Sequence, residues 1–212
     1  MKARFFLVRH GETAWNREGR FQGQRDVPLN ERGIEQAEAL ARALKSCGAK
    51  FVWSSPLSRA KVTAEKIGQA MGLPVYIDDD LKEINHGLWE GRTMEEVKNM
   101  WPAVLEAWHS QPHTVKMPDG EDLALLQARA FAAYCRIGEH GEGPHVVVTH
   151  DAVMKTMLCL FLEMPLSGFW RFQLGNASVS IVEKTERGMR ATLLGDTCHL
   201  GDPYFRAEQK GL

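Results

Sequence analysis

Two basic residues suited to phosphate chemistry follow a short apolar run near the start of the chain. The run is FFLV, residues Phe5 to Val8, and Arg9 and His10 come directly after it. A strand end is a rigid place from which to aim a nucleophile and a cation at one anionic group. Basic residues also end many strands simply because the strand meets water there. This pair alone therefore leaves both readings open.

Basic residues follow two further apolar runs in the same way. The run Phe51 to Trp53 is followed by SSPLS and Arg59, and the run Val146 to Val148 is followed by Thr149 and His150. In an open parallel sheet, ligands bind beyond the carboxyl ends of the strands. We therefore predict that the three places converge on one crevice, which favours the chemical reading.

Two arginines and two histidines around one point predict a receptor for a compact dianion such as a phosphate group. Arginine pairs bidentately with phosphate oxygens, and a neutral imidazole can attack phosphorus to form a phosphohistidine. The leaving group also needs a proton, and Glu83 in DLKEINHGLWEG is the expected donor. Its apolar neighbours Ile84, Leu88 and Trp89 would shield it from water and so raise its pKa.

The rest of the pattern predicts the elements that must position these residues. Strand-like runs alternate with apolar spacings typical of helices, and a pair of strands follows near the C-terminus. We expect helices at about 34–44, 58–71, 93–101, 121–139 and 152–163, and strands at 177–184 and 189–196. This alternation predicts a three-layer α/β/α sandwich with a largely parallel central sheet.

The chain fits a single domain covering residues 1–212. The segment at about 81–122 is its least regular part and is expected to be a lid-like insertion over one end of the sheet. A composition of 44% hydrophobic and 25% charged residues with a net charge of -1 gives no electrostatic argument for a nucleic acid or an anionic membrane as partner.

The cysteines and the apolar runs bear on the location of the protein. The four cysteines are widely spaced with no C-x-x-C pair, which predicts neither a zinc knuckle nor a dithiol redox site. The longest apolar stretch, residues 153–162, falls far short of the roughly 20 residues that span a bilayer. We therefore expect a soluble, cytoplasmic protein, and the sequence leaves open whether it forms a homodimer.

The order of these motifs resembles the histidine phosphatase superfamily, the phosphoglycerate mutase-like proteins. The resemblance covers nearly the whole chain in four blocks: Arg9-His10-Gly11-Glu12-Thr13 with Trp15-Asn16, Gln22-Gly23, Pro28-Leu29, Gly33 and Gln36-Ala37; Ser54 to Leu57 with Arg59-Ala60 and Thr63-Ala64; Glu83 with Gly87 and Trp89-Glu90-Gly91; and Val146 to His150. It implies His10 as nucleophile and Glu83 as general acid. It also implies phosphate contacts from Arg9, Arg59 and His150, a pocket lined by Asn16, Gln22 and Gly23, and neither a metal nor a cofactor.

One position departs from the family pattern. The family usually places glycine after its last histidine, whereas Asp151 and Ala152 follow His150 here. A carboxylate facing inward would repel a phosphate group. We therefore predict that Asp151 turns away and caps the next helix.

A finer resemblance within the superfamily bears on the substrate. Several segments are most similar to the metal-independent phosphoserine phosphatases: Ile84 to Gly87, Trp108 to His113, Phe169-Trp170 with Asn176 to Ser178, and Thr197 to Gly201. The expected activity is hydrolysis of a small-molecule phosphomonoester through a phosphohistidine, with His86 and His199 binding the leaving group. Three alternatives stay open: phosphoglycerate mutase-like transfer, broad-specificity phosphatase and α-ribazole phosphatase. The short spacing between Glu83 and His150 favours an open site and hence hydrolysis.

Overall fold

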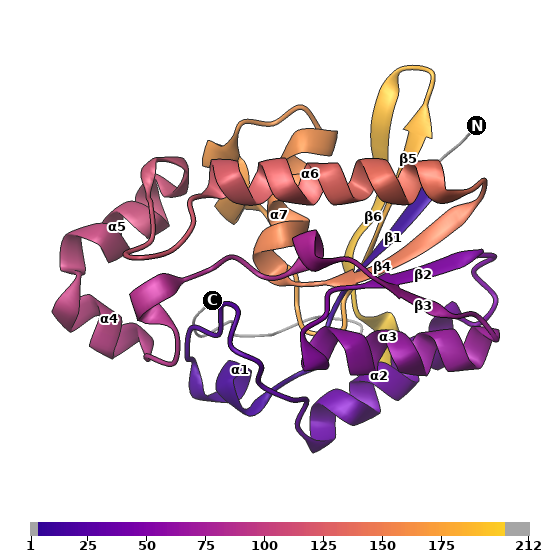
Figure 1. Ribbon diagram of the computed structural model, residues 1–212, viewed down its shortest axis with the longest axis horizontal. Helices are drawn as coiled ribbons and strands as arrows, with labels where there is room; N and C mark the ends of the chain where they lie inside the picture. The colour runs from indigo at the N-terminus through magenta and orange to yellow at the C-terminus, as the bar shows by residue number, and fades with distance from the viewer. Residues whose placement is uncertain (1–3, 202–212) are drawn as a thin grey trace.

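The computed structural model describes residues 4–201, which form a sandwich around one six-stranded sheet (Figure 1). The strands are ordered β3-β2-β4-β1-β5-β6. Their bounds are Arg4–Arg9 (β1), Phe51–Ser54 (β2), Val75–Ile77 (β3), Pro144–Thr149 (β4), Val179–Thr185 (β5) and Gly188–Asp196 (β6). The first four pair in parallel, whereas β5 and β6 are antiparallel. The predicted largely parallel sheet is confirmed.

Helices cover both faces of the sheet, as the alternating pattern predicted. The long helices are α2 (Glu31–Leu44), α3 (Ser58–Met71), α6 (Leu123–His140) and α7 (Asp151–Phe161). Successive side chains of a strand point to opposite faces. Phe6 and Val8 of β1 therefore pack with α2 and α3, and Phe5 and Leu7 pack with α6 and α7. Figure 1 shows these two pairs of helices on opposite sides of the strands.

The register of the two central strands brings the predicted histidines together. In the parallel pair of β1 and β4, Arg9 lies opposite Thr149. A histidine directly follows the last residue of each strand, His10 after β1 and His150 after β4. The backbone N–H of His10 donates to the carbonyl oxygen of Thr149 at 3.1 Å. Neighbouring strands lie about 4.8 Å apart, so His10 and His150 lie side by side.

The segment at about 81–122 lies at the end of the molecule toward which β1 and β4 run (Figure 1). It contains α4 (Met94–Met100), α5 (Pro102–Ser110) and the 3₁₀ turns η2 (Gly87–Trp89) and η3 (Pro112–Thr114). The predicted capping box at Thr93 is present, and α4 ends before Pro102 as expected. Pro102 also begins α5, which the sequence analysis missed, because proline suits the first turn of a helix. A lid function for this segment stays a prediction.

Several short elements were not predicted. These are α1 (Ala14–Glu18), β3, and the 3₁₀ turns η1 (Asp79–Leu81), η4 (Leu166–Arg171) and η5 (Cys198–Leu200). Such elements are too short for a periodic apolar pattern. In α1, a reciprocal capping pair of Thr13 and Asn16 sets the first turn. Within residues 4–201, no helix is both long and apolar enough to cross a membrane.

Candidate active site

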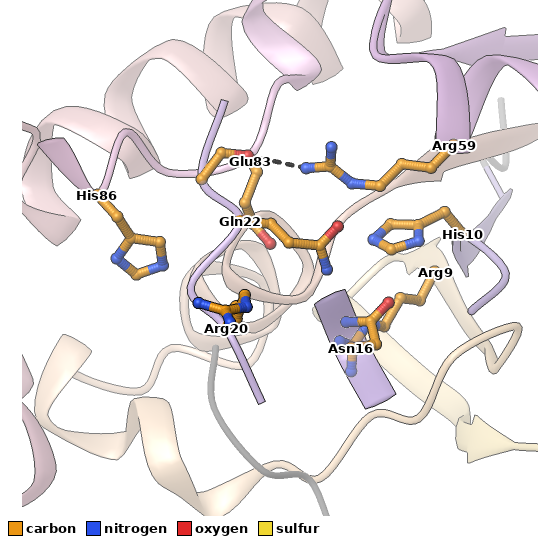
Figure 2. A pocket seen from close by; sticks show the side chains of 9 residues that line it. Arg9, His10, Asn16, Arg20, Gln22, Arg59, Glu83 and His86 are labelled. Atoms are coloured by element: carbon orange, nitrogen blue, oxygen red, sulfur yellow. Dashed lines mark hydrogen bonds between the residues drawn. The ribbon is translucent and has the colours of Figure 1, made fainter. Parts of the chain in front are cut away.

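A pocket lies beyond the carboxyl ends of the central strands and gathers most of the predicted site residues (Figure 2). Its lining consists of Arg9, His10, Asn16, Arg20, Gln22, Gly23, Arg59, Glu83 and His86. His150 is not part of this lining, but its ring centroid lies 5.1 Å from that of His10. Arg20 was not predicted, and His199 lies outside the lining.

His10 is held in the form that a nucleophile needs. Its Nδ1 lies 2.6 Å from the carbonyl oxygen of Gly11. A carbonyl only accepts hydrogen bonds, so Nδ1 carries a proton and the neutral ring has its lone pair on Nε2. Burial lowers the pKa of His10 well below its usual value, and the charges of Arg59 and Arg9 lower it further. The ring is therefore neutral at neutral pH.

His150 is also neutral, and its orientation suits a hydrogen-bond donor. Its Nε2 lies 2.9 Å from Ser55 Oγ, and its buried Nδ1 has no hydrogen-bond partner among the described residues. In the tautomer whose Nε2 accepts from the Ser55 hydroxyl, Nδ1 carries the proton and can donate to a ligand. Burial, followed by the charge of Arg59, lowers the pKa of His150 well below its usual value.

Arg59 provides a buried positive charge at the pocket. It is the second residue of α3 and is fully buried. Its Nη1 and Nη2 donate to the carbonyl oxygens of Arg25 and Gly23, each at 2.8 Å, and the dashed line in Figure 2 marks the bond to Gly23. Its Nε is buried without a hydrogen-bond partner among the described residues. Burial lowers the pKa of Arg59 to about 10, so it remains charged at neutral pH.

Arg9 forms an ion pair with Asp151, the residue that departs from the family pattern. Arg9 Nη1 donates to the carbonyl oxygen of Leu174 and lies 3.4 Å from Asp151 Oδ1. Asp151 is fully buried, and its Oδ2 lies 2.7 Å from Lys155 Nζ. The prediction that Asp151 caps α7 is wrong, because His150 is the N-cap residue and its side chain makes no capping bond. Asp151 does not line the pocket, which agrees with the prediction that it turns away, and its carboxylate is buried between two cations.

Glu83 has the environment expected of a general acid. Only 8% of its surface is exposed. Burial raises its pKa, and the nearby charge of Asp151 raises it further. Its Oε1 accepts from the backbone N–H groups of Ile84 at 3.0 Å and Ala152 at 3.2 Å. The direction of the shift agrees with the sequence analysis, although Leu88 is 46% exposed and contributes little shielding.

The loop that carries Gly23 requires glycine. Its φ is 52°, in the left-handed region, and an added Cβ would lie 2.1 Å from Glu90 Oε1. That oxygen accepts a hydrogen bond from the Gln24 backbone N–H at 2.8 Å. A larger residue at position 23 would displace the Glu90 side chain and shift the loop. The Gly23 carbonyl oxygen, which accepts a hydrogen bond from Arg59, would shift with the loop.

Asn16 and Gln22 offer further donors to the pocket. The Thr13 hydroxyl donates to Gln22 Oε1 at 3.0 Å, and Asn176 Nδ2 donates to Asn16 Oδ1 at 3.1 Å. Because both side-chain carbonyl oxygens are occupied, the two NH₂ groups are the ends left for a ligand. The contact between Asn176 and Asn16 joins segments distant in sequence.

His86 and Arg20 line the pocket away from the histidine pair. His86 packs against Phe21 and Trp89, and burial lowers its pKa to about 3, so the ring is neutral. Arg20 Nη1 donates to the carbonyl oxygen of Gly91 at 2.8 Å, and its side chain is one-third exposed. In Figure 2, Glu83 lies between His10 and His86. The only sequence signal for Arg20 was its place two residues before Gln22.

His199 lies on η5, on the side of the sheet that carries α2. It is hydrogen-bonded with the backbone of Ala177, and burial lowers its pKa. It does not line the pocket. Its predicted contact with a leaving group stays a prediction, and the tail beyond Gly201 lies outside the described residues.

The fold and this pocket are those of an enzyme that acts on phosphate esters. A neutral histidine at a strand end, buried arginines and a buried carboxyl group with a raised pKa are the parts needed to move a phosphoryl group from oxygen to nitrogen. Within the described part of the chain, no group of three or more His, Cys, Asp or Glu residues is arranged to hold a metal ion.

The chain belongs to the histidine phosphatase superfamily (branch 1), whose family profile matches residues 5–197. It is 39% identical over 207 residues to phosphoserine phosphatase 1 of Hydrogenobacter thermophilus, covering 97% of this chain and 98% of that protein. It is 34% identical over 215 residues to the probable phosphoglycerate mutase GpmB of Salmonella arizonae, covering 97% and 98%. The structure of YhfR from Bacillus stearothermophilus superposes with a TM-score of 0.88 at 34% identity, covering 93% of this chain and 99% of that one.

Proposed function

We propose that this protein hydrolyses small phosphomonoesters through a phosphohistidine on His10. The observation that carries the proposal is the neutral ring of His10, with its lone pair on Nε2, beside the buried cations Arg9 and Arg59. In the first step, Nε2 attacks phosphorus, the N–P bond forms and the P–O bond to the leaving group breaks. Glu83 gives its proton to the departing oxygen.

Water completes the cycle in the second step. The Glu83 carboxylate takes a proton from a water molecule, whose oxygen attacks phosphorus while the N–P bond breaks. Inorganic phosphate leaves, and both His10 and Glu83 return to their starting forms. The raised pKa of Glu83 supports this dual use, since the group must gain and lose a proton near neutral pH.

The phosphate oxygens are held by Arg9, Arg59 and His150, with Asn16 and Gln22 as further donors. These groups place fixed positive charge and hydrogen-bond donors where other phosphoryl-transfer enzymes use magnesium. We expect turnover of an aryl phosphate to continue in excess chelator. Activity that disappeared with the chelator and returned with magnesium would contradict this part of the proposal.

The substrate that we propose is a small carboxylate-bearing ester such as L-phosphoserine. The similarity to phosphoserine phosphatase 1 supports this substrate. His86 lies on the far side of Glu83 from His10 in Figure 2, on the side where a leaving group would extend, and Arg20 lines the same pocket. A neutral imidazole N–H and a guanidinium group both donate to a carboxylate. The tail that carries His199 would add donors if it covers the pocket.

A phosphate-release screen over metabolite phosphomonoesters tests the proposal. We expect His86→Ala to reduce kcat/KM for L-phosphoserine much more than for an aryl phosphate that lacks the carboxylate. Ser110→Ala, an exposed change at the end of α5, serves as the control. Equal losses on both substrates would indicate a packing role for His86. A wild-type protein without phosphoserine activity would indicate a different ester.

Phosphoglycerate mutase activity is the second candidate, because several relatives carry the name probable phosphoglycerate mutase. Both reactions share the phosphohistidine, and they differ in whether water or a substrate hydroxyl takes the phosphoryl group. The mutase reading requires interconversion of 2- and 3-phosphoglycerate to outpace phosphate release. We expect the opposite.

We also propose a cytoplasmic location and a small-molecule partner. All four cysteines are unpaired thiols, which supports a reducing compartment. A homodimer stays a prediction that light scattering of the purified protein would test.

A further inference from the structure

Asp151 is a buried charge whose position the reaction scheme above does not explain. It is fully buried at the first position of α7, directly after His150. Its two oxygens lie 3.4 Å from Arg9 Nη1 and 2.7 Å from Lys155 Nζ. A buried carboxylate of this kind persists only with close counter-charges, because desolvation of an isolated charge is costly.

Lys155, which pairs with the Asp151 carboxylate, is buried like its partner. It lies one turn further along α7 and is 1% exposed. Its Nζ lies 4.6 Å from the ring centroid of Trp170 and 5.2 Å from that of Phe169. The indole Nε1 of Trp170 donates to the carbonyl oxygen of Trp108 in α5 at 2.6 Å. This aromatic wall fixes the ammonium group and so fixes the position of Asp151.

Asp151 also belongs to the surroundings of Glu83. The backbone N–H of Ala152, the next residue, donates to Glu83 Oε1 at 3.2 Å. The charged groups that act on the Glu83 carboxyl group are Asp151 from α7, Arg59 from α3 and Arg9 from β1, and His10 and His86 line the same pocket. Arg129 from α6 donates to the Glu83 carbonyl oxygen at 2.8 Å, and its own charge is paired with Glu121. Asp151 is the negative charge among the three groups that act on the carboxyl group. Two carboxyl groups close together in a buried site favour the neutral form of one of them.

We propose that Asp151, fixed by Lys155, is a positioning residue of the reaction that orients Arg9 toward the phosphate and stabilises the protonated form of Glu83. The inference rests on the proposed function, since it assumes that Glu83 is the general acid. Asp151 reaches no substrate atom in this scheme and acts through its two neighbours. Lys155 balances its charge, so that the carboxylate does not cancel the attraction of Arg9 for the substrate.

The pH profile of kcat/KM distinguishes this role from a structural one. The variants are Asp151→Asn, Lys155→Met and the double variant, with Glu83→Gln as the reference. The substrates are p-nitrophenyl phosphate, whose acidic leaving group needs little protonation, and the alkyl phosphomonoester with the highest turnover in the screen. With the alkyl ester, kcat/KM should fall at alkaline pH as Glu83 deprotonates, and this fall is the alkaline limb of the profile. The Glu83→Gln variant should lack the alkaline limb.

The signs of the shifts are specific. Asp151→Asn removes a negative charge near Glu83, so the alkaline limb for the alkyl ester should move to lower pH by about one unit, a roughly tenfold change on that limb. Lys155→Met removes a positive charge and should move the limb to higher pH. The double variant should fall between Asp151→Asn and the wild type, because it removes both charges. The p-nitrophenyl phosphate profiles should shift far less.

Asp151→Ala tests the contact with Arg9. Asparagine keeps an oxygen that can accept from Arg9, whereas alanine does not. Inorganic phosphate should therefore inhibit Asp151→Ala more weakly than Asp151→Asn. Should the single Asp151 variants not fold, the double variant and Lys155→Met still give limbs displaced in opposite directions.

Two outcomes separate the inference from the proposed function. A wild-type protein that hydrolyses neither ester, or a Glu83→Gln variant that keeps the alkaline limb, contradicts the proposed function. An alkaline limb that depends on Glu83 but is unmoved in the Asp151 and Lys155 variants contradicts only the inference. Equal losses on both esters at every pH would show that the pair is merely structural.

Discussion

Replacing Glu83 by glutamine isolates the proton that the proposed mechanism needs. Glutamine has nearly the same shape and keeps an Oε1 that can accept from the backbone N–H groups of Ile84 and Ala152. The fold and the pocket should therefore survive. A positioned general acid contributes roughly 10² to 10⁴ in rate, which corresponds to about 3 to 5 kcal/mol of transition-state stabilisation.

We expect Glu83→Gln to reduce kcat/KM for an alkyl phosphomonoester by about 10² to 10⁴. The loss for p-nitrophenyl phosphate should be much smaller, since nitrophenolate leaves without a proton. Steady-state phosphate release at neutral pH measures both, with the exposed Glu95→Gln on α4 as the matched control. An equal loss on the two esters would refute the role of Glu83 as proton donor.

The same variant carries a stability signature. The folded-state pKa of Glu83 is raised, so the folded protein binds this proton more tightly than the unfolded chain does. Stability is therefore lost as pH rises from the usual carboxyl range through the folded pKa. Glu83→Gln lacks this loss, and its free energy of unfolding should rise relative to the wild type as pH increases. Urea unfolding at several pH values measures the difference, and a difference independent of pH would argue against the raised pKa.

Three further predictions follow from the site. Wild-type protein quenched with denaturant during turnover at alkaline pH should carry an acid-labile phosphoryl label, and His10→Asn should lack it; label that persisted on the variant would place the nucleophile elsewhere. Gly23→Ala should destabilise the protein by about 1 to 2 kcal/mol from the left-handed backbone alone, with a larger rise in KM because Glu90 is displaced; an unchanged KM would mean that the loop adapts. Burial lowers the pKa values of His10 and His150 below 6.5, so the unfolded chain takes up these protons first and stability should fall as pH drops below about 6.5, less steeply in His10→Asn; equal slopes would contradict a depressed pKa.

The sequence alone predicted the layers of the fold and the main residues of the pocket. Short apolar runs such as Phe5 to Val8 can be read locally, because a strand buried on both faces needs apolar side chains at every position. The parallel order of such strands then places the residue after each run at one edge of the sheet. His10 and His150 become neighbours for this reason.

Short elements gave weaker signals. The strand Val75–Ile77 and the helix Ala14–Glu18 contain too few residues for a periodic pattern. The strand is paired with β2, and the helix begins at the capping pair of Thr13 and Asn16. Arg20 likewise joins the pocket lining only once its loop meets the segment that carries Glu83 and His86.

Only the tertiary structure decided where Asp151 points. From the sequence, an inward carboxylate beside a phosphate site looked too repulsive, and a capping role was predicted instead. The folded chain brings Arg9 from β1 to one oxygen and holds Lys155 against the other with the aromatic ring of Trp170. The sign of the local field depends on charges that meet only after packing, and no local pattern in the sequence records which of them will lie within a few ångströms of each other.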